Sequence, residues 1–330
     1  MGRRLLWAVL LVAALIGGGL TVYQHVAAAR LRRGFAEWES AAHAAGWQVS
    51  SGAVSVSGWP RSAVLEVPNF RISGTAGGPL WESQRLRLVL DLFRPDRVTV
   101  LAQGQQRAGV LGRPEQRFTG RLLRIVVPFD PAAGEPVATL TARGVAVPAD
   151  GVGIGSLTGE LLAMQPDVRF RVAAQVVQLP GEQRWPLGRE VAEVAADGVV
   201  AGNMPGPAPV EAAMRAWRAA GGRLEVQDGA IRWGQLDARF RGTAELDGDL
   251  QPVASGTAWL SGYAQALDAM AARHVMSNDG ALAAKAVLSL LARVPAGGGP
   301  AQVEVPFGLK DEVLSVGPVP LVRLRRVVWG

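Results

Sequence analysis

The side chains that most often carry catalysis or bind metals are sparse in this sequence of 330 residues. The three histidines, His25, His43 and His274, are far apart, and there is no cysteine. Without cysteine, zinc-finger, thiol and disulfide chemistries are excluded. The HExxH, GxSxG and SxxK signatures are also missing, so the common metalloprotease and serine-nucleophile sites are not expected.

A glycine pattern and the acidic residues give no better support for chemistry. Gly153, Gly155 and Gly159 resemble a dinucleotide fingerprint, but the third glycine comes one place late. No strand–helix–strand pattern surrounds them, so we interpret them as turns between strands. Asp and Glu occur singly at strand edges, as expected of a solvated sheet face. We therefore expect no catalytic residues, no metal and no cofactor; an enzyme using dispersed Asp and Arg residues is the least favoured hypothesis.

Apolar residues at alternating positions form the remaining candidate site. Each of two predicted strands has one apolar and one polar face, with Arg87 and Arg171 on the polar faces. Such strands either close on one another or belong to a sheet that curls and leaves an apolar trough suited to acyl chains. An ordinary closed core is the commoner outcome. The predicted apolar face consists of Leu86, Leu88, Leu90, Leu92, Val168, Phe170 and Val172.

The elements that position this face are mostly short strands. Apolar residues make up 49% of the chain and charged residues 19%, and the 41 glycines and 21 prolines indicate many turns. We predict a mainly β (α+β) fold with antiparallel sheets, because most strands alternate apolar and polar residues. Helical periodicity predicts helices over residues 27–45, 209–220, 263–273 and 281–293.

Two stretches of the sequence resemble one another. Ala44-Ala45-Gly46 and Ala219-Ala220-Gly221 each end a predicted amphipathic helix, and each is followed by a strand. Gly52-Ala53 and Gly229-Ala230 then predict matching hairpin turns. Chance matching of alanine and glycine is the alternative to a duplicated unit. We divide the chain into a tail and anchor (1–29), a helix with a β meander (30–205) and a second such unit with two extra helices (206–330).

An uncharged apolar run, Leu5 to Val22, precedes all of these elements. As a helix it would span roughly 27 Å, close to the hydrocarbon thickness of a bilayer. A cleaved signal peptide is the alternative, because Ala27-Ala28-Ala29 resembles a cleavage site. The run is longer than the apolar core of a typical signal, so we expect a single-pass signal anchor with the remaining chain translocated.

The net charge of +6 is carried almost wholly by arginine, since Lys285 and Lys310 are the only lysines. These arginines are dispersed, and no nucleic-acid-binding motif accompanies them. We expect no nucleic-acid partner. Anionic lipid headgroups are the better partner for a basic domain attached to a membrane.

Several short motifs, in the expected order, resemble those of a bacterial family. Ser57-Gly58-Trp59-Pro60, Trp81 and Leu86 to Pro95 resemble the N-terminal signature of domain of unknown function family 2125. Its C-terminal signature is similar to Gly229–Gly234, Ala244–Pro252 and Val316–Leu321. This resemblance implies an AsmA-like protein, anchored in the bacterial inner membrane with its β-rich domain in the periplasm. AsmA-like proteins are implicated in outer-membrane lipid homeostasis through an apolar β groove.

Two functions other than catalysis follow as hypotheses. The first is a protein of cell-envelope and lipid homeostasis that binds phospholipid on an apolar sheet face or groove. The second is a scaffold that recruits envelope proteins by adding their strands to its sheet edges, without binding lipid. An apolar trough open at one end would favour the first, and a closed core with a flat exposed edge strand would favour the second.

Overall fold

The computed structural model of the chain describes residues 24–58, 61–75, 78–109, 115–164, 167–181, 185–202, 207–294, 301–317 and 319–329. The predicted membrane span, Leu5 to Val22, lies outside these residues. Among the helices of the described part, none combines the length and the hydropathy needed to cross a bilayer.

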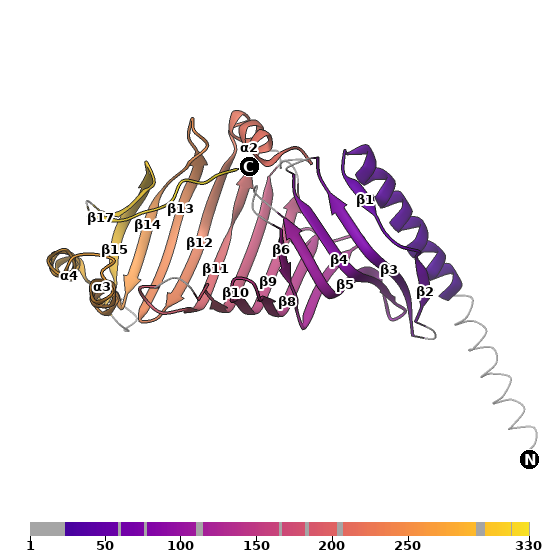
Figure 1. Ribbon diagram of the computed structural model, residues 1–330, viewed down its shortest axis with the longest axis horizontal. Coiled ribbons are helices and arrows are strands. Elements are labelled where there is room, and N and C mark those ends of the chain that lie inside the picture. The colour runs from indigo at the N-terminus through magenta and orange to yellow at the C-terminus, as the bar shows by residue number, and fades with distance from the viewer. Residues whose placement is uncertain are drawn as a thin grey trace, which may run out of the picture.

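Within the described residues, seventeen strands form one antiparallel sheet, shown in Figure 1. From β7 to β17 each strand pairs with the next one along the chain, as β3, β4 and β5 also do. At the beginning, β1 and β2 both pair with β3, and β6 and β7 both pair with β5. The predicted mainly β, antiparallel fold class is confirmed. The strands are β1 Gln48–Ser50, β2 Ser55–Ser57, β3 Ser62–Ser73, β4 Leu80–Asp91, β5 Arg94–Gly109, β6 Gln116–Phe118, β7 Leu122–Pro128, β8 Ala138–Val147, β9 Val152–Met164, β10 Val168–Gln178, β11 Glu190–Ala201, β12 Arg223–Trp233, β13 Leu236–Leu246, β14 Pro252–Ser261, β15 Val303–Lys310, β16 Val313–Val316 and β17 Val319–Arg323.

Four helices occur in the described part, close to the predicted ranges. They are the N-terminal helix, described over residues 24–44, α2 (Val210–Ala219), α3 (Tyr263–Ala272) and α4 (Asn278–Leu291). The N-terminal helix lies at one end of the sheet and the α3–α4 pair at the other, while α2 lies at the ends of the strands (Figure 1). Trp217 of α2 donates its indole N–H to the Ala201 carbonyl at 3.0 Å.

One face of the sheet is apolar from end to end, because the strand register places apolar residues opposite one another. The other face is polar; there Arg171 forms ion pairs with Glu160 at 3.2 Å and with Asp197 at 2.9 Å. Cross-strand partners on the apolar face include Leu88–Val100, Val100–Ile125, Ile125–Leu140, Leu161–Phe170, Phe240–Ala258 and Ala258–Val305.

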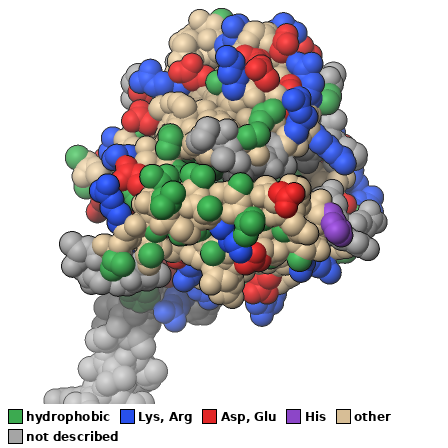
Figure 2. Space-filling view, turned by 90° about the vertical axis from the view of Figure 1, so that its left-hand side faces the viewer, with side chains coloured by type: hydrophobic (Ala, Val, Ile, Leu, Met, Phe, Trp, Pro, Cys, Tyr) green, Lys and Arg blue, Asp and Glu red, His purple; other side chains and the backbone are tan. Residues whose placement is uncertain are grey.

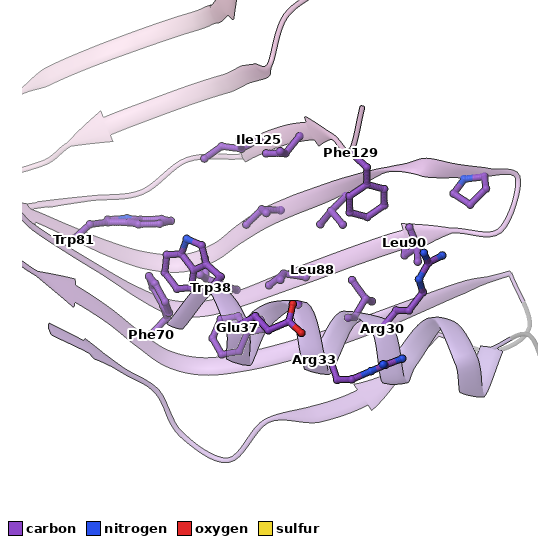
Figure 3. Close-up of a pocket in the computed structure, with 18 residues that line it drawn as sticks. Arg30, Arg33, Glu37, Trp38, Phe70, Trp81, Leu88, Leu90, Ile125 and Phe129 are labelled. Atoms are coloured by element: carbon purple, nitrogen blue, oxygen red, sulfur yellow. The ribbon is translucent and has the colours of Figure 1, made fainter. Parts of the chain in front are cut away.

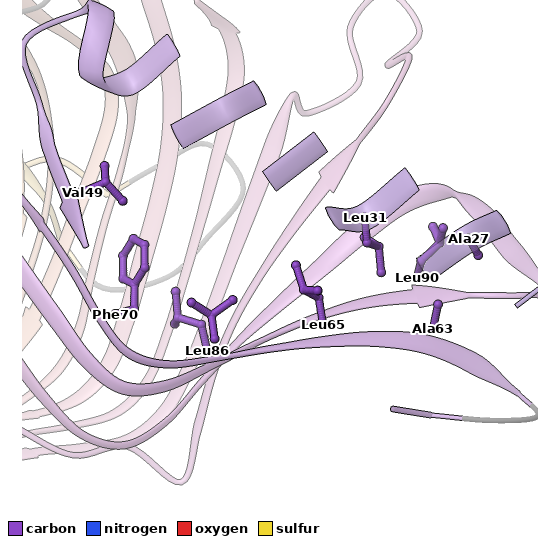
Figure 4. Packing of buried hydrophobic residues seen from close by; sticks show 9 residues of the cluster. Ala27, Leu31, Val49, Ala63, Leu65, Phe70, Leu86 and Leu90 are labelled. Carbon is purple, nitrogen blue, oxygen red and sulfur yellow. The ribbon is translucent and has the colours of Figure 1, made fainter. Parts of the chain in front are cut away.

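The largest core cluster lies under the N-terminal helix (Figure 4). Ala27 and Leu31 of the helix pack on Leu65, Leu86 and Leu90 of β3 and β4, and Leu65 is fully buried. The helix is amphipathic, so burying its apolar stripe against the adjacent strands stabilises both elements. A second region of the core packs α3 and α4 on the strands around the fully buried Val303.

The α3–α4 end also exposes apolar side chains (Figure 2). Most of them lie on α4 and just beyond it, where Leu282, Leu290 and Val294 are at least two-thirds exposed. The inner side of the same helix buries Ala281 and Ala284. As a result α4 is apolar on two sides, although only one side packs against α3 and the sheet.

The predicted Gly-Ala hairpin turns are wrong. Gly52-Ala53 joins β1 to β2, which both pair with β3 rather than with each other. Gly229-Ala230 lies inside β12, where Gly229 pairs with Phe240. The proposed boundary between the two units falls between β11 and β12, which are themselves paired. The duplication stays a prediction.

The turns predicted at three other glycines are also wrong, since Gly153, Gly155 and Gly159 all lie inside β9. Other strand glycines on the apolar face are covered by aromatic rings from the neighbouring strand. A Cβ atom added at each would lie within 3.2 Å of the ring opposite it. Such pairing lets a large ring compensate for the missing side chain. The pairs are Gly198 with Phe170, Gly229 with Phe240 and Gly256 with Phe307.

We expect Gly198→Ala to destabilise the sheet and Gly159→Ala to leave its stability unchanged or slightly higher. A Cβ at Gly198 would lie 2.2 Å from the Glu225 carbonyl oxygen, so the backbone of β12 must move, at a cost of about 1–3 kcal/mol. At Gly159 the nearest atom is 3.6 Å away, an ordinary contact. Denaturant unfolding of the two variants measures the difference; equal midpoints would contradict the close approach of β11 and β12.

Candidate functional site: an apolar trough beneath the N-terminal helix

A half-open cavity of about 850 Å³ lies between the N-terminal helix and the apolar face of the sheet. The helix forms one wall, β4 and β5 form the floor, and β7 with the residue that follows it forms the far wall (Figure 3). We call this cavity the trough. Its lining includes Leu31, Gly34 and Phe35 from the helix, Leu86, Leu88 and Leu90 from β4, Val98 and Val100 from β5, and Ile125, Val127 and Phe129 from the far wall.

Helical and strand periodicity together build the trough. Helix residues three and four apart share one face, which brings Leu31, Gly34 and Phe35 to the same side. Alternation along β4 directs its leucines to the same face of the sheet as Val100 and Ile125. Gly34 leaves open space on the helix wall, since a Cβ atom added there would meet nothing within 4 Å.

A chain of aromatic rings bounds one end of the trough, which we call the aromatic end. The ring centroids are 5.8 Å apart for Phe35 and Trp38, 6.1 Å for Trp38 and Phe70, and 5.5 Å for Phe70 and Trp81. Figure 3 shows Trp38, Phe70 and Trp81 together there. The indole N–H of Trp81 donates to the Gln106 side chain at 3.3 Å, so its polar atom is satisfied away from the apolar lining.

The opposite end, which we call the arginine end, carries the positive charges, while Glu37 lies on the helix wall between the two ends. Arg30 lies there near Leu90 and Phe129 (Figure 3), and Arg33 lies further along the helix. Among the described residues Arg30 has no ion-pair partner. Next to the trough-lining Pro95, a hydrogen bond from Arg97 lowers the pKa of the exposed Asp96 carboxyl. Charge is thus confined to the rim, while the interior is hydrocarbon.

Such a site can bind an apolar chain by removing it from water. Each buried methylene contributes about 0.8 kcal/mol, without any need for directional contacts. The rim arginines can pair with an anionic group at the end of that chain. Within the described part of the molecule, no group of three or more His, Cys, Asp or Glu residues is placed to hold a metal ion.

The structure brings together part of the predicted apolar face. Leu86, Leu88 and Leu90 line the trough, whereas Leu92 lies in the turn after β4 and is not part of the lining. The predicted β10 residues lie outside the trough, on the continuation of the same face: they are Val168, Phe170 and Val172. Sequence reasoning missed Gly34, although a lone glycine among helix formers was a visible signal. It also missed the far wall, Ile125 to Phe129.

One comparison with known proteins gives a match. A family model described as an uncharacterized protein conserved in bacteria, DUF2125, matches residues 25–325, which include every residue that lines the trough. It is the family that the sequence motifs resemble. No curated protein and no solved structure matches the chain.

Proposed function

The chain belongs to the bacterial family DUF2125, and from this premise we propose that it handles lipid in the cell envelope. In this proposal the chain binds one acyl chain of a phospholipid in the trough and carries out no chemical step. A trough of about 850 Å³ with an apolar interior and arginines at its rim is the observation that supports it most directly. An acyl chain would replace water against the leucines of β4, and its headgroup would remain at the arginine end.

We further propose that the predicted span anchors the protein in the inner membrane, with the sheet in the periplasm, as in AsmA-like proteins. The uncharged run Leu5 to Val22 supports the anchor, because its length suits a bilayer. It ends two residues before Gln24, where the described part of the N-terminal helix begins. The trough would therefore lie close to the lipid that it takes up.

A photo-cross-linking experiment with two neighbouring valines tests the proposal. Val127 lines the trough, whereas Val126 points to the polar face and pairs with Thr99 and Thr139. A benzophenone amino acid placed at position 127 in the full chain is expected to cross-link to lipid in intact bacterial membranes. Intact-mass spectrometry should then find a lipid adduct at position 127 and only background at position 126. Equal adducts at both positions, or none at either, would refute acyl-chain binding in the trough.

The alternative function, a scaffold that recruits proteins by strand addition, has less support. In the described residues the sheet ends in short strands on both sides: β17 has five residues, Val319 to Arg323, and β1 and β2, which pair only with β3, have three each. Strand β17 contains Pro320, which lacks a backbone N–H, and ends in an arginine. Short edges with proline and charge are the features that discourage pairing with another chain.

A further inference from the structure

Three loops meet at the arginine end of the trough and form a single surface. The backbone N–H of Leu92, in the β4–β5 turn, donates to the carbonyl of Arg61, which precedes β3, at 3.3 Å. The N–H of Phe129, which follows β7, donates to the carbonyl of Asp96 at 2.8 Å. We call the surface formed by Arg61, residues 92–96 and Phe129 the platform.

The platform presents two large aromatic side chains to the outside. Phe93 is 79% exposed and Phe129, which also borders the trough, is 61% exposed. Single exposed apolar residues are common on protein surfaces. Two backbone hydrogen bonds hold the segments that carry these two rings, from Leu92 to Arg61 and from Phe129 to Asp96, at the same end of the sheet. Exposed aromatic rings next to charged groups favour the interfacial layer of a bilayer.

The chain enters the structure at the same end. Ala27, in the first turn of the described helix, packs beside Ala63 and Leu90, which are close to the platform (Figure 4). The predicted span directly precedes this turn in the sequence. A bilayer that holds residues 5–22 would therefore lie next to the platform rather than next to α4, at the other end of the sheet (Figure 1).

The exposed arginines at this end of the molecule favour contact with an anionic membrane surface. Arg30, Arg32 and Arg33 are exposed on the first turns of the helix, and the basic residues here outnumber the acidic ones. Asp96 already pairs with Arg97, so it does not neutralise the helix arginines. Basic residues immediately after a span are attracted to anionic lipid headgroups, and the attraction fades within about one Debye length.

We infer that the platform lies on the surface of an anionic bilayer, with Phe93 and Phe129 in the interfacial layer. The arginine end of the trough then opens at the membrane, and an acyl chain reaches the lining without crossing bulk water. The aromatic end points away from the bilayer. This inference rests on the proposed membrane attachment and adds a fixed orientation and a route of entry.

Single fluorescent labels test this orientation cleanly, because the chain has no cysteine. The full chain, carrying Phe93→Cys or Phe129→Cys, is labelled with the polarity-sensitive dye NBD in nanodiscs that contain phosphatidylglycerol. Both labels are expected to emit at shorter wavelength than in water and to be quenched by nitroxide-bearing lipid. The control is Gly248→Cys, in the β13–β14 loop, where an added Cβ meets nothing within 4 Å. Its label is expected to behave as in water.

The outcomes separate this inference from the proposed function. Phe93 does not line the trough, so the label at position 93 reports the orientation independently of bound lipid, whereas Phe129 borders the trough and its label alone does not decide. Labels at positions 93 and 129 that match the control in emission and quenching overturn the orientation, even when the lipid adduct at Val127 is present. Quenched labels without that adduct support the orientation and refute acyl-chain binding instead.

Discussion

A Leu65→Asp chain is expected to lose more than about 4 kcal/mol of folding free energy, because a buried carboxylate without a partner is among the most destabilising of changes. Leu65 is fully buried in β3, and its cross-strand partners are Val56 of β2 and Leu88 of β4. The N-terminal helix closes the same core from above. The charge would therefore separate the helix from the sheet and open the trough. Urea unfolding, followed by tryptophan fluorescence, measures the loss.

The neighbouring residue in β3 supplies the control. Glu66 faces the polar side and pairs with Arg87 at 3.3 Å, where both side chains are about a third exposed. Half-exposed pairs of this kind contribute at most about 1 kcal/mol. The Nε atom of Arg87 is buried, so Glu66→Ala is expected to cost somewhat more than a surface change but far less than Leu65→Asp. If Leu65→Asp and Glu66→Ala unfolded at the same urea concentration, the assignment of inner and outer faces would be refuted.

Filling the trough at Gly34 is expected to weaken acyl-chain binding more than tenfold while leaving the fold intact. Gly34→Trp places an indole in open space at the middle of the helix wall. Displacing only two buried methylenes costs about 1.6 kcal/mol, and 1.4 kcal/mol is already a tenfold change in affinity. Replacing a helix glycine also stabilises the helix, so lost binding would not arise from unfolding. Titration of the full chain in amphipol with the fluorescent fatty acid cis-parinaric acid gives the affinity.

Two matched variants control for the size of the indole and for the loss of glycine. Ala36→Trp adds the same ring to an exposed position of the same helix that does not line the trough, so binding is expected to be unchanged. Gly34→Ala gains helix propensity without filling the trough. It should therefore bind as the wild type does and unfold at a slightly higher urea concentration. Wild-type affinity in a folded Gly34→Trp chain would place the binding site elsewhere.

Alternation of apolar residues made much of the fold predictable from the sequence. The row of leucines in β4 and the valines and phenylalanine of β10 have period two, and both segments are strands. The helices were predictable for the corresponding reason, because their apolar residues recur every three or four positions. These local patterns predict the structure well because most strands pair with a neighbour along the chain. No distant partner then overrides the local preference for strand or helix.

Strands with irregular spacing were missed. Val191 and Val194 of β11 are three apart, and a register shift between Val191 and Glu193 interrupts the alternation. Alanine and glutamate are also common in this strand, and neither favours strands. The glycines of β9 and β12 suggested turns, but the tertiary structure retains them inside strands. At Gly229 the ring of Phe240 occupies the space above the backbone, and a sequence does not reveal that contact.

The site was predictable as a surface but not as a cavity. Alternation identified the floor of the trough in β4. It could not show that the N-terminal helix stands away from that floor, because this depends on the curvature of the sheet. The far wall comes from β7, about forty residues later in the chain, and meets β4 only through β5. Curvature of this kind depends on the summed twist of many strands rather than on any one segment.

The nearly sequential order of the strands has a consequence for how the molecule assembles. From β3 onward each strand finds its partner in a strand that precedes it closely along the chain, and only α2 and the α3–α4 pair separate neighbours by more than a loop. Such local pairing avoids the slow closure of long loops. A chain delivered from its N-terminus can therefore close the helix, β3 and β4 first and then lengthen the sheet one strand at a time. Each new edge strand is covered as soon as the next segment has been synthesised. This shortens the time in which an open edge can pair with another molecule.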